Sequence, residues 1–496
     1  MLLVSGIWLA RFYLRYIGQH DYGLWIVGTQ LLVYLTLTDF GVVELLPQQI
    51  AYATGRAGGQ AVGHELQQLV GQTVRLVMMQ LPAVIAIATA MFFMIPAEWR
   101  GLRGPLGLIL AGFVLSFPLR IIPAMLQGLQ DLGFLGKVQL ISWFLTTCAT
   151  VLMVYAGWGL FALALGWLVG QMIATPVFII RIRRHFPGVV PKGLPPLNWP
   201  RTREQLGKGM WLCVSQIAQP LVAGSDLLII GKLFGPAAVV PYACTGKVIG
   251  VLANQAQILM QTATPGLCEM KTAESRSRIL GVLVALTHGI LTFSGLVFCG
   301  VAIINQWFVT WWVGSKQWGG LTLTITLAVA MLFRHWTTTT AYGVFCFGYQ
   351  RRISLTNLID GAITASVCFV LTMQFGVVGA AAASLVGAIL VSLPANLSII
   401  AQDVGISIWE LIHDMVTSFL WRFLAVGGAA VLIGSKWTPS SLPVAIFTAL
   451  AITLVYSAVM LPNILRSPLG NYVRPVLSSL RLKFTNAPVS LSHEQS

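Results

Sequence analysis

The chain has 496 residues, of which 56% are hydrophobic and only 9% are charged, and its mean hydropathy is +0.81. These values exclude a typical soluble domain, in which about a quarter of the residues are charged, and they indicate an integral membrane protein. The formal charge of +15 does not indicate nucleic-acid binding, because the basic residues are dispersed among loops rather than gathered on one module.

Apolar runs recur along the whole chain, with lengths near the roughly 20 residues that an α-helix needs to cross a bilayer. A transmembrane β-barrel would instead show alternating segments of about ten residues. The runs between polar or Gly/Pro breaks give fourteen candidate helices. In chain order these are 1–17, 23–46, 69–95, 105–126, 138–156, 160–180, 205–230, 239–261, 279–304, 321–347, 353–375, 378–400, 411–433 and 442–461.

Short landmarks recur at nearly one offset and indicate two related halves. The stretch RYIGQHDYGLW, which contains Gly18, aligns with KLFGPAAVVPY, which contains Gly235, at a shift of 217 positions. Further on, QGLQ ending at Gln130 resembles FGYQ ending at Gln350, at a shift of 220. Because each half has an even number of helices, six, both insert the same way up, as in transporters built from parallel repeats.

We therefore predict an all-α polytopic membrane protein with two six-helix lobes around a central cavity and two further C-terminal helices. The cations concentrate in the loops that share a side with both termini, so the positive-inside rule places both termini in the cytoplasm. The predicted divisions are an N-terminal lobe over 1–184, a basic cytoplasmic linker over 185–204, a C-terminal lobe over 205–402, an additional helix pair over 403–465 and a cytoplasmic tail over 466–496.

Enzyme motifs are missing from the sequence. It contains no P-loop, no GxSxG and no HExxH, and its seven cysteines lie singly without CxxC spacing. We expect neither catalytic residues nor a metal or another cofactor. Without an ATP-binding module, transport would draw on an H⁺ or Na⁺ gradient, the membrane potential or the gradient of the substrate itself.

Ionisable residues inside the apolar runs are the functional candidates, because a charge in hydrocarbon needs a partner or a water-filled cavity. Cations outnumber acids among them, which suits an anionic substrate such as a diphosphate, whose oxygens pair well with guanidinium groups. The candidate cavity cations are Arg11, Arg15, Arg120 and Arg334. The candidates for ion coupling or for an ion pair are Asp39, Asp226 and Lys247.

Each candidate also has a structural explanation. Arg11 and Arg15 lie near a helix end, where snorkelling to the headgroups explains them equally well. Lys247 could form an ion pair with Asp226 or with Glu44 rather than bind substrate. His335 beside Arg334 could carry a proton, although a hydrogen-bonded structural role is more common for a single histidine.

Three segments carry a family resemblance. They are ARFYLRYIGQHDYGLWIVGTQLLVYLTLTDFGV from Ala10, GSDLLIIGKLFGPAAVVPYACTGKV from Gly224, and FGYQRRISLTNLIDGAITASVCFVLTMQFGVVGAAAASLVG from Phe347. These segments resemble the polysaccharide-exporting, Wzx-like flippases of the multidrug/oligosaccharidyl-lipid/polysaccharide (MOP) exporter superfamily. The second segment includes the family's aspartate, which here is Asp226.

This resemblance implies a transporter that moves an undecaprenyl-diphosphate-linked oligosaccharide, such as an O-antigen unit of lipopolysaccharide or an exopolysaccharide unit, across a bacterial inner membrane. The glycan lipid would pass from the cytoplasmic to the periplasmic leaflet by alternating access, with its diphosphate held by the four candidate arginines. Membrane lipids and the polysaccharide polymerase machinery are the implied partners. A cation-coupled multidrug exporter and a lipid II flippase of the same superfamily remain as alternatives, and the basic candidates favour an anionic substrate over cationic drugs.

Overall fold

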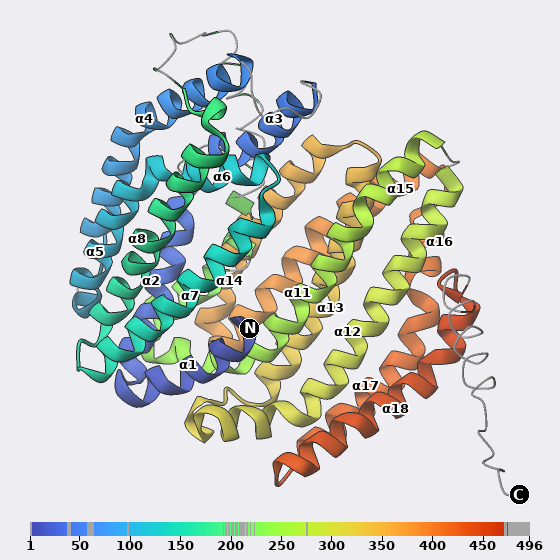
Figure 1. Ribbon diagram of the computed structural model, residues 1–496. Helices are drawn as coiled ribbons and strands as arrows, with labels where there is room; N and C mark the ends of the chain where they lie inside the picture. Colours follow the sequence, from blue (N-terminus) through green and yellow to red (C-terminus); the bar gives the residue numbers. More distant parts are fainter. Residues whose placement is uncertain are drawn as a thin grey trace, which may run out of the picture. The chain divides into compact units, whose positions relative to one another are not determined.

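The computed structural model describes residues 2–36, 41–56, 64–96, 99–191, 224–273, 276–470 and 474, with scattered positions between 193 and 222. Helices account for nearly all of these residues, and no strand occurs among them (Figure 1). Within the same described ranges, nine helical segments are long and apolar enough to cross a membrane. The predicted all-α, multi-pass membrane fold is therefore confirmed, whereas the count of fourteen helices stays a prediction.

The helices fall into two compact units. Unit 1 comprises Met1–Ala243 and Asn357–Gln374, and unit 2 comprises Cys244–Thr356 and Phe375–Ser496. The described helices up to residue 233 are α1 (Leu2–Tyr16), α2 (Gln19–Thr36), α3 (Val42–Arg56), α4 (His64–Phe93), α5 (Arg100–Ser116), α6 (Ile121–Gly128), α7 (Leu132–Tyr155), α8 (Leu160–His185) and α10 (Ser225–Leu233). The later helices are α11 (Pro236–Ala273), α12 (Arg276–Val313), α13 (Leu321–Cys346), α14 (Gln350–Gly387), α15 (Leu393–Val404), α16 (Ile408–Ile412), α17 (Ser418–Lys436) and α18 (Leu442–Arg466). These units are grouped by packing rather than by repeat, so the predicted lobe, linker and tail boundaries stay predictions.

In unit 1, α7 packs along α8 and is joined to it by polar contacts at two levels. The Ser142 hydroxyl donates to the Gly170 carbonyl at 3.0 Å. Near the other end of the pair, Arg181 Nε donates to Asp131 Oδ2 at 2.9 Å, and its guanidinium lies 4.7 Å from the centroid of the Phe134 ring. Ser142 and Gly170 lie within the two helices, and Asp131 lies directly before α7, so the contacts fix the register of α7 against α8.

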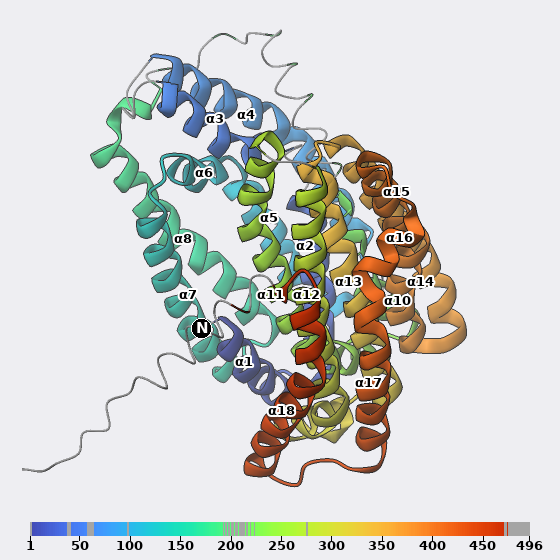
Figure 2. The same ribbon diagram turned by 90° about the vertical axis from the view of Figure 1, so that its right-hand side faces the viewer.

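In unit 2, the additional helix pair packs on α12, which also contacts α13 (Figures 1 and 2). The rings of Phe298 on α12 and Phe423 on α17 meet edge to face with centroids 5.1 Å apart. On α18, the buried Tyr456 donates its hydroxyl to the Thr292 carbonyl at 2.8 Å. Aromatic packing of this kind with a satisfied hydroxyl stabilises buried helix contacts, so α17 and α18 are integral parts of unit 2.

The predicted internal repeat is visible in the backbone. Gly18 between α1 and α2 has φ +92°, and Gly235 between α10 and α11 has φ +83°. A second pair with the same 217-residue spacing is Gly159 (φ 52°, ψ −131°) and Gly376 (φ 64°, ψ −148°). This conformation is essentially restricted to glycine, and in both halves it comes directly before an apolar helical segment.

Several predicted helices are interrupted. Within the expected helix 23–46, residues 37–40 lie outside the described residues, and α3 begins after Gly41, whose φ is +70°. The expected helix 105–126 is divided by a 3-10 turn at Phe117–Arg120, where Pro118 supplies no N–H for an α-helical bond. The expected helix 205–230 lies mostly outside the described residues, and its last part is α10.

A run of four threonines lies in the middle of α13. Each hydroxyl of residues 337–340 donates to a backbone carbonyl three or four residues earlier in the helix, at 2.8–3.1 Å. Threonine in membrane helices commonly satisfies its donor in this way. The run is therefore polar in composition but hydrogen-bonded within its own helix.

Candidate functional site

The acidic candidate Asp226 begins α10 and is held by two donors. Its Oδ1 accepts the Leu227 N–H at 2.8 Å, and its Oδ2 accepts the Tyr242 hydroxyl at 2.6 Å. The turn at Gly235 brings α11 back beside α10, so the buried Tyr242 reaches the carboxylate across the hairpin. A carboxylate in the first turn of a helix is also favoured by the helix dipole. The chemistry available at Asp226 is the binding of a proton or a small cation.

The cationic candidate Arg120 ends the 3-10 turn of unit 1 and is half-buried. Its guanidinium carbon lies 5.9 Å from the centroid of the Phe113 ring and 5.8 Å from that of Phe117. Both distances are within the range of cation–π attraction. Contact with two ring faces orients Arg120, and a guanidinium has five N–H donors in a planar fork that matches an oxyanion.

The second half-buried cation, Arg334, lies on α13 in unit 2. Its Nε donates to the hydroxyl of Ser384 on α14 at 2.9 Å, which orients the guanidinium by a contact between two helices. Arg120 and Arg334 therefore share one chemical character, that of a planar cation held by its own unit inside membrane-spanning helices.

His335, the next residue, has both ring nitrogens engaged. Nδ1 is bonded to the Ser294 hydroxyl of α12, and Nε2 lies 3.1 Å from the Ala253 carbonyl of α11. A carbonyl is an acceptor only, so Nε2 carries the hydrogen and Nδ1 accepts from serine. The buried ring thus joins α11, α12 and α13, which favours the structural role over proton transport.

The remaining candidates are more exposed. Arg11 and Arg15 lie one turn apart on α1, and both are exposed, as is Lys247 on α11. The two hydrogen bonds described for Asp226 come from Tyr242 and Leu227, so its pairing with Lys247 stays a prediction.

Two further acidic candidates are only partly described. Asp39 lies outside the described residues, and the side chain of Glu44 does too.

Two positioning residues were not expected from the sequence. The sequence does contain an indication of the contact between Tyr242 and Asp226. Tyr242 lies seven residues after Gly235 and Asp226 lies nine residues before it. In a hairpin of two helices, residues at similar distances from the turn lie opposite each other. Ser384 has no such indication, because it is fifty residues from Arg334 and meets it only through tertiary packing.

A family model described as "Polysaccharide biosynthesis protein" matches residues 65–322, just over half of the chain. The chain belongs to this family. Among proteins with curated descriptions, none matches this polysaccharide biosynthesis protein significantly.

Solved structures share the fold of this polysaccharide biosynthesis protein. The lipid II flippase MurJ in an inward closed conformation matches with a TM-score of 0.66 and 11% identity, over 94% of this chain and 98% of that chain. An inward-facing multidrug resistance MATE family transporter of the MOP superfamily matches with a TM-score of 0.57 and 13% identity, over 81% of this chain and 95% of that chain. A MOP superfamily transporter from Pyrococcus furiosus matches with a TM-score of 0.51 and 13% identity, over 81% of this chain and 93% of that chain.

The family match confirms the predicted link to polysaccharide biosynthesis, and the structural matches show that the chain shares its fold with a lipid II flippase and with transporters of the MOP superfamily. At 11–13% identity the structural likeness concerns the fold alone, so the substrate has to be argued from the residues of this chain.

Proposed function

We propose that this protein is a flippase for a polyprenyl-diphosphate-linked oligosaccharide, which it moves from the cytoplasmic to the periplasmic leaflet of a bacterial inner membrane. The observation that carries the proposal is the pair of half-buried, pre-oriented arginines in a member of a polysaccharide biosynthesis family. The positive-inside distribution of the loop cations supports the orientation with both termini in the cytoplasm.

The diphosphate is the part of such a substrate that these arginines would recognise. A guanidinium fork binds two phosphate oxygens at once and keeps its charge at every physiological pH. Arg120 is oriented by two aromatic faces and Arg334 by the Ser384 hydroxyl, so little side-chain entropy is lost when phosphate binds. By the predicted boundaries one arginine lies in each repeat, and alternating access by the two repeats is the proposed mechanism of transport.

Coupling to an ion gradient would use Asp226. Its carboxylate lies at the start of α10 and accepts hydrogen bonds from the Leu227 N–H and the Tyr242 hydroxyl. A proton or Na⁺ would bind the carboxylate in place of one of these donors. The membrane potential is a second source, because moving one charge across 100 mV is worth about 2.3 kcal/mol.

The test measures where the glycan lipid lies in cells. A strain that lacks this gene should accumulate lipid-linked oligosaccharide on the cytoplasmic face, out of reach of an external glycan-binding probe, and should lose surface polymer. Arg120→Ala and Arg334→Ala should reproduce the accumulation at wild-type membrane abundance, because each removes an oriented phosphate ligand. Lys436→Ala, an exposed cation at the end of α17, is the matched control and should restore export fully.

Other results would redirect the assignment. Wild-type export by both arginine variants would remove these residues from the site. Unchanged glycan lipid on both faces in the deletion strain would contradict the proposed substrate, and drug accumulation and lipid II assays on the same strains would then decide between the two alternatives.

A further inference from the structure

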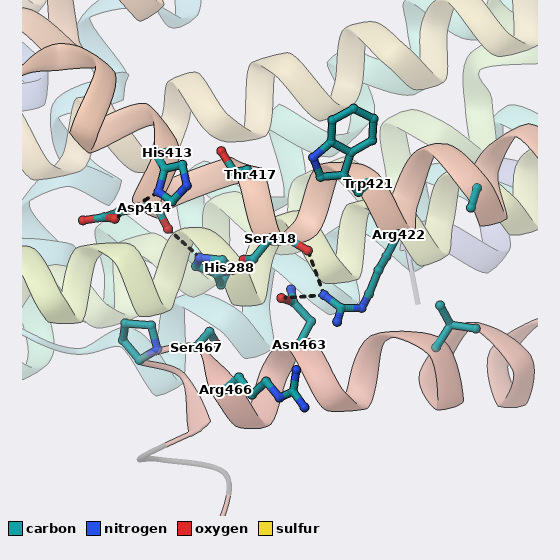
Figure 3. A pocket seen from close by; sticks show the side chains of 13 residues that line it. His288, His413, Asp414, Thr417, Ser418, Trp421, Arg422, Asn463, Arg466 and Ser467 are labelled. Atoms are coloured by element: carbon teal, nitrogen blue, oxygen red, sulfur yellow. Dashed lines mark hydrogen bonds and ion pairs between the residues drawn. The ribbon is translucent and has the colours of Figure 1, made fainter.

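A pocket of about 720 Å³ opens in unit 2 where the start of α17 and the end of α18 meet the middle of α12 (Figure 3). None of the proposed transport residues line it. Its charged and strongly polar lining comes from three helices and the π-helical turn before α17. These side chains are His288, His413, Asp414, Arg422, Asn463 and Arg466.

Two buried side chains of this pocket have incomplete hydrogen bonding. His288 is 2% exposed and Asn463 is 3% exposed. The Nδ1 atom of His288 and the Nδ2 atom of Asn463 have no hydrogen-bond partner among the described residues. Buried polar atoms are almost always paired, because leaving one unpaired is costly. Both therefore call for a ligand with complementary groups.

Their other atoms define what that ligand must offer. His288 Nε2 lies 2.8 Å from the Asp414 carbonyl and must donate to it, so Nδ1 of the neutral ring is an acceptor. Asn463 Oδ1 accepts from Arg422 Nη1 at 3.3 Å, which makes Nδ2 a donor (Figure 3). The complement is a molecule with both acceptor oxygens and a hydroxyl donor.

The charge of the pocket favours a singly charged anion. Arg422 and Arg466 bring two positive charges, and Asp414 brings one negative charge that lies 3.6 Å from His413. The balance is one positive charge, which a single phosphodiester neutralises. Arginine forks are well suited to phosphate oxygens.

The position of the pocket along the helices points to a membrane lipid. Arg466 is the last residue of α18, and Trp421 on α17, 72% exposed, lines the same pocket. Tryptophan and arginine at the ends of membrane helices mark the headgroup level of the bilayer. Below them, Ala425 and Val459 give the pocket an apolar side along which an acyl chain can lie.

We propose that this pocket binds the headgroup of an anionic glycerophospholipid of the phosphatidylglycerol type. The phosphodiester oxygens accept from Arg422, Arg466 and Asn463 Nδ2, and a headgroup hydroxyl donates to His288 Nδ1. Such a lipid joins α12, α17 and α18 and so fastens the additional helix pair to the rest of unit 2. This assignment does not depend on which molecule the protein transports.

The test counts retained lipid on the full-length protein by native mass spectrometry after delipidation and titration with phosphatidylglycerol or phosphatidylethanolamine. The wild type should retain one phosphatidylglycerol and bind it at least tenfold more tightly than phosphatidylethanolamine. The double variant R422Q/R466Q should bind phosphatidylglycerol at least tenfold more weakly. Lys436→Gln, at the opposite end of α17, is the matched control and should bind as the wild type does.

A second variant guards against misfolding. Arg466 is exposed at a helix end, so Arg466→Gln alone should fold and weaken binding several-fold, and added phosphatidylglycerol should raise the Tm of the wild type more than that of this variant. Equal affinity of the wild type and both variants would overturn the proposal, as would equal binding of phosphatidylethanolamine. Displacement of phosphatidylglycerol by a polyprenyl diphosphate would also overturn it, because the pocket would then belong to the transported substrate.

Discussion

The turn at Gly376 allows backbone strain to be measured without any steric change. Its φ of 64° and ψ of −148° lie in a region that is essentially closed to other residues. A Cβ added there would have no heavy atom within 4 Å, so Gly376→Ala tests the backbone alone. Strain of this kind costs about 1–3 kcal/mol, and we expect the free energy of unfolding to fall by that amount.

Gly428 provides the matched control for this substitution. It lies inside α17, outside the set of glycines with positive φ, and an added Cβ there also has no heavy atom within 4 Å. Alanine in a helix is more stable than glycine by roughly 0.5–1 kcal/mol, so Gly428→Ala should stabilise the protein. Reversible unfolding in mixed detergent micelles measures both changes. Equal effects of the two substitutions would refute the reasoning, since only one of them meets a forbidden backbone conformation.

Three further substitutions test individual contacts. Tyr242→Phe removes the 2.6 Å bond to Asp226 and should lower the free energy of unfolding by about 1–3 kcal/mol; an unchanged value in the micelle assay would mean that the bond contributes nothing. Ser384→Ala removes the acceptor for Arg334 Nε and should reduce export about fivefold, the equivalent of roughly 1 kcal/mol, at constant abundance. Arg181→Lys keeps the charge but loses the planar contact with a ring and should cost about 0.5–1 kcal/mol; a lysine variant as stable as the wild type would contradict this.

The sequence was sufficient for the features that depend on local patterns. Apolar runs predicted the membrane helices because the length of a span and its composition are properties of the run itself. The alignment of Gly18 with Gly235 predicted the repeat because the positive φ at this turn favours glycine in both halves. Gln130 has a φ of 59°, and the corresponding residue with positive φ in the second half is Gly348, with a φ of 90°. The alignment of Gln130 with Gln350 was therefore two residues out of register.

Features that depend on tertiary packing were beyond the sequence. Arg120 was predicted as a cavity cation, but its contacts with Phe113 and Phe117 depend on the 3-10 turn. Proline in a membrane helix does not by itself predict such a turn. The lipid pocket brings together His288, Arg422 and Asn463 from three helices, and nothing in their spacing indicates that they meet. Two unpaired buried atoms revealed it instead.

The threonine run of α13 affects how membrane crossings are counted. A hydropathy sum subtracts a penalty for every polar side chain, and α13, which carries Arg334 and His335 as well as its threonines, is not among the nine described segments that qualify by apolarity. The hydroxyls of residues 337–340 are bonded within the helix, so their cost in hydrocarbon is smaller than the scale assumes. Each crossing left out of the count reverses its parity, and parity assigns every later loop to one face of the membrane. The four self-bonded threonines, together with Arg334 and His335, therefore bear on which side the C-terminal segment is placed.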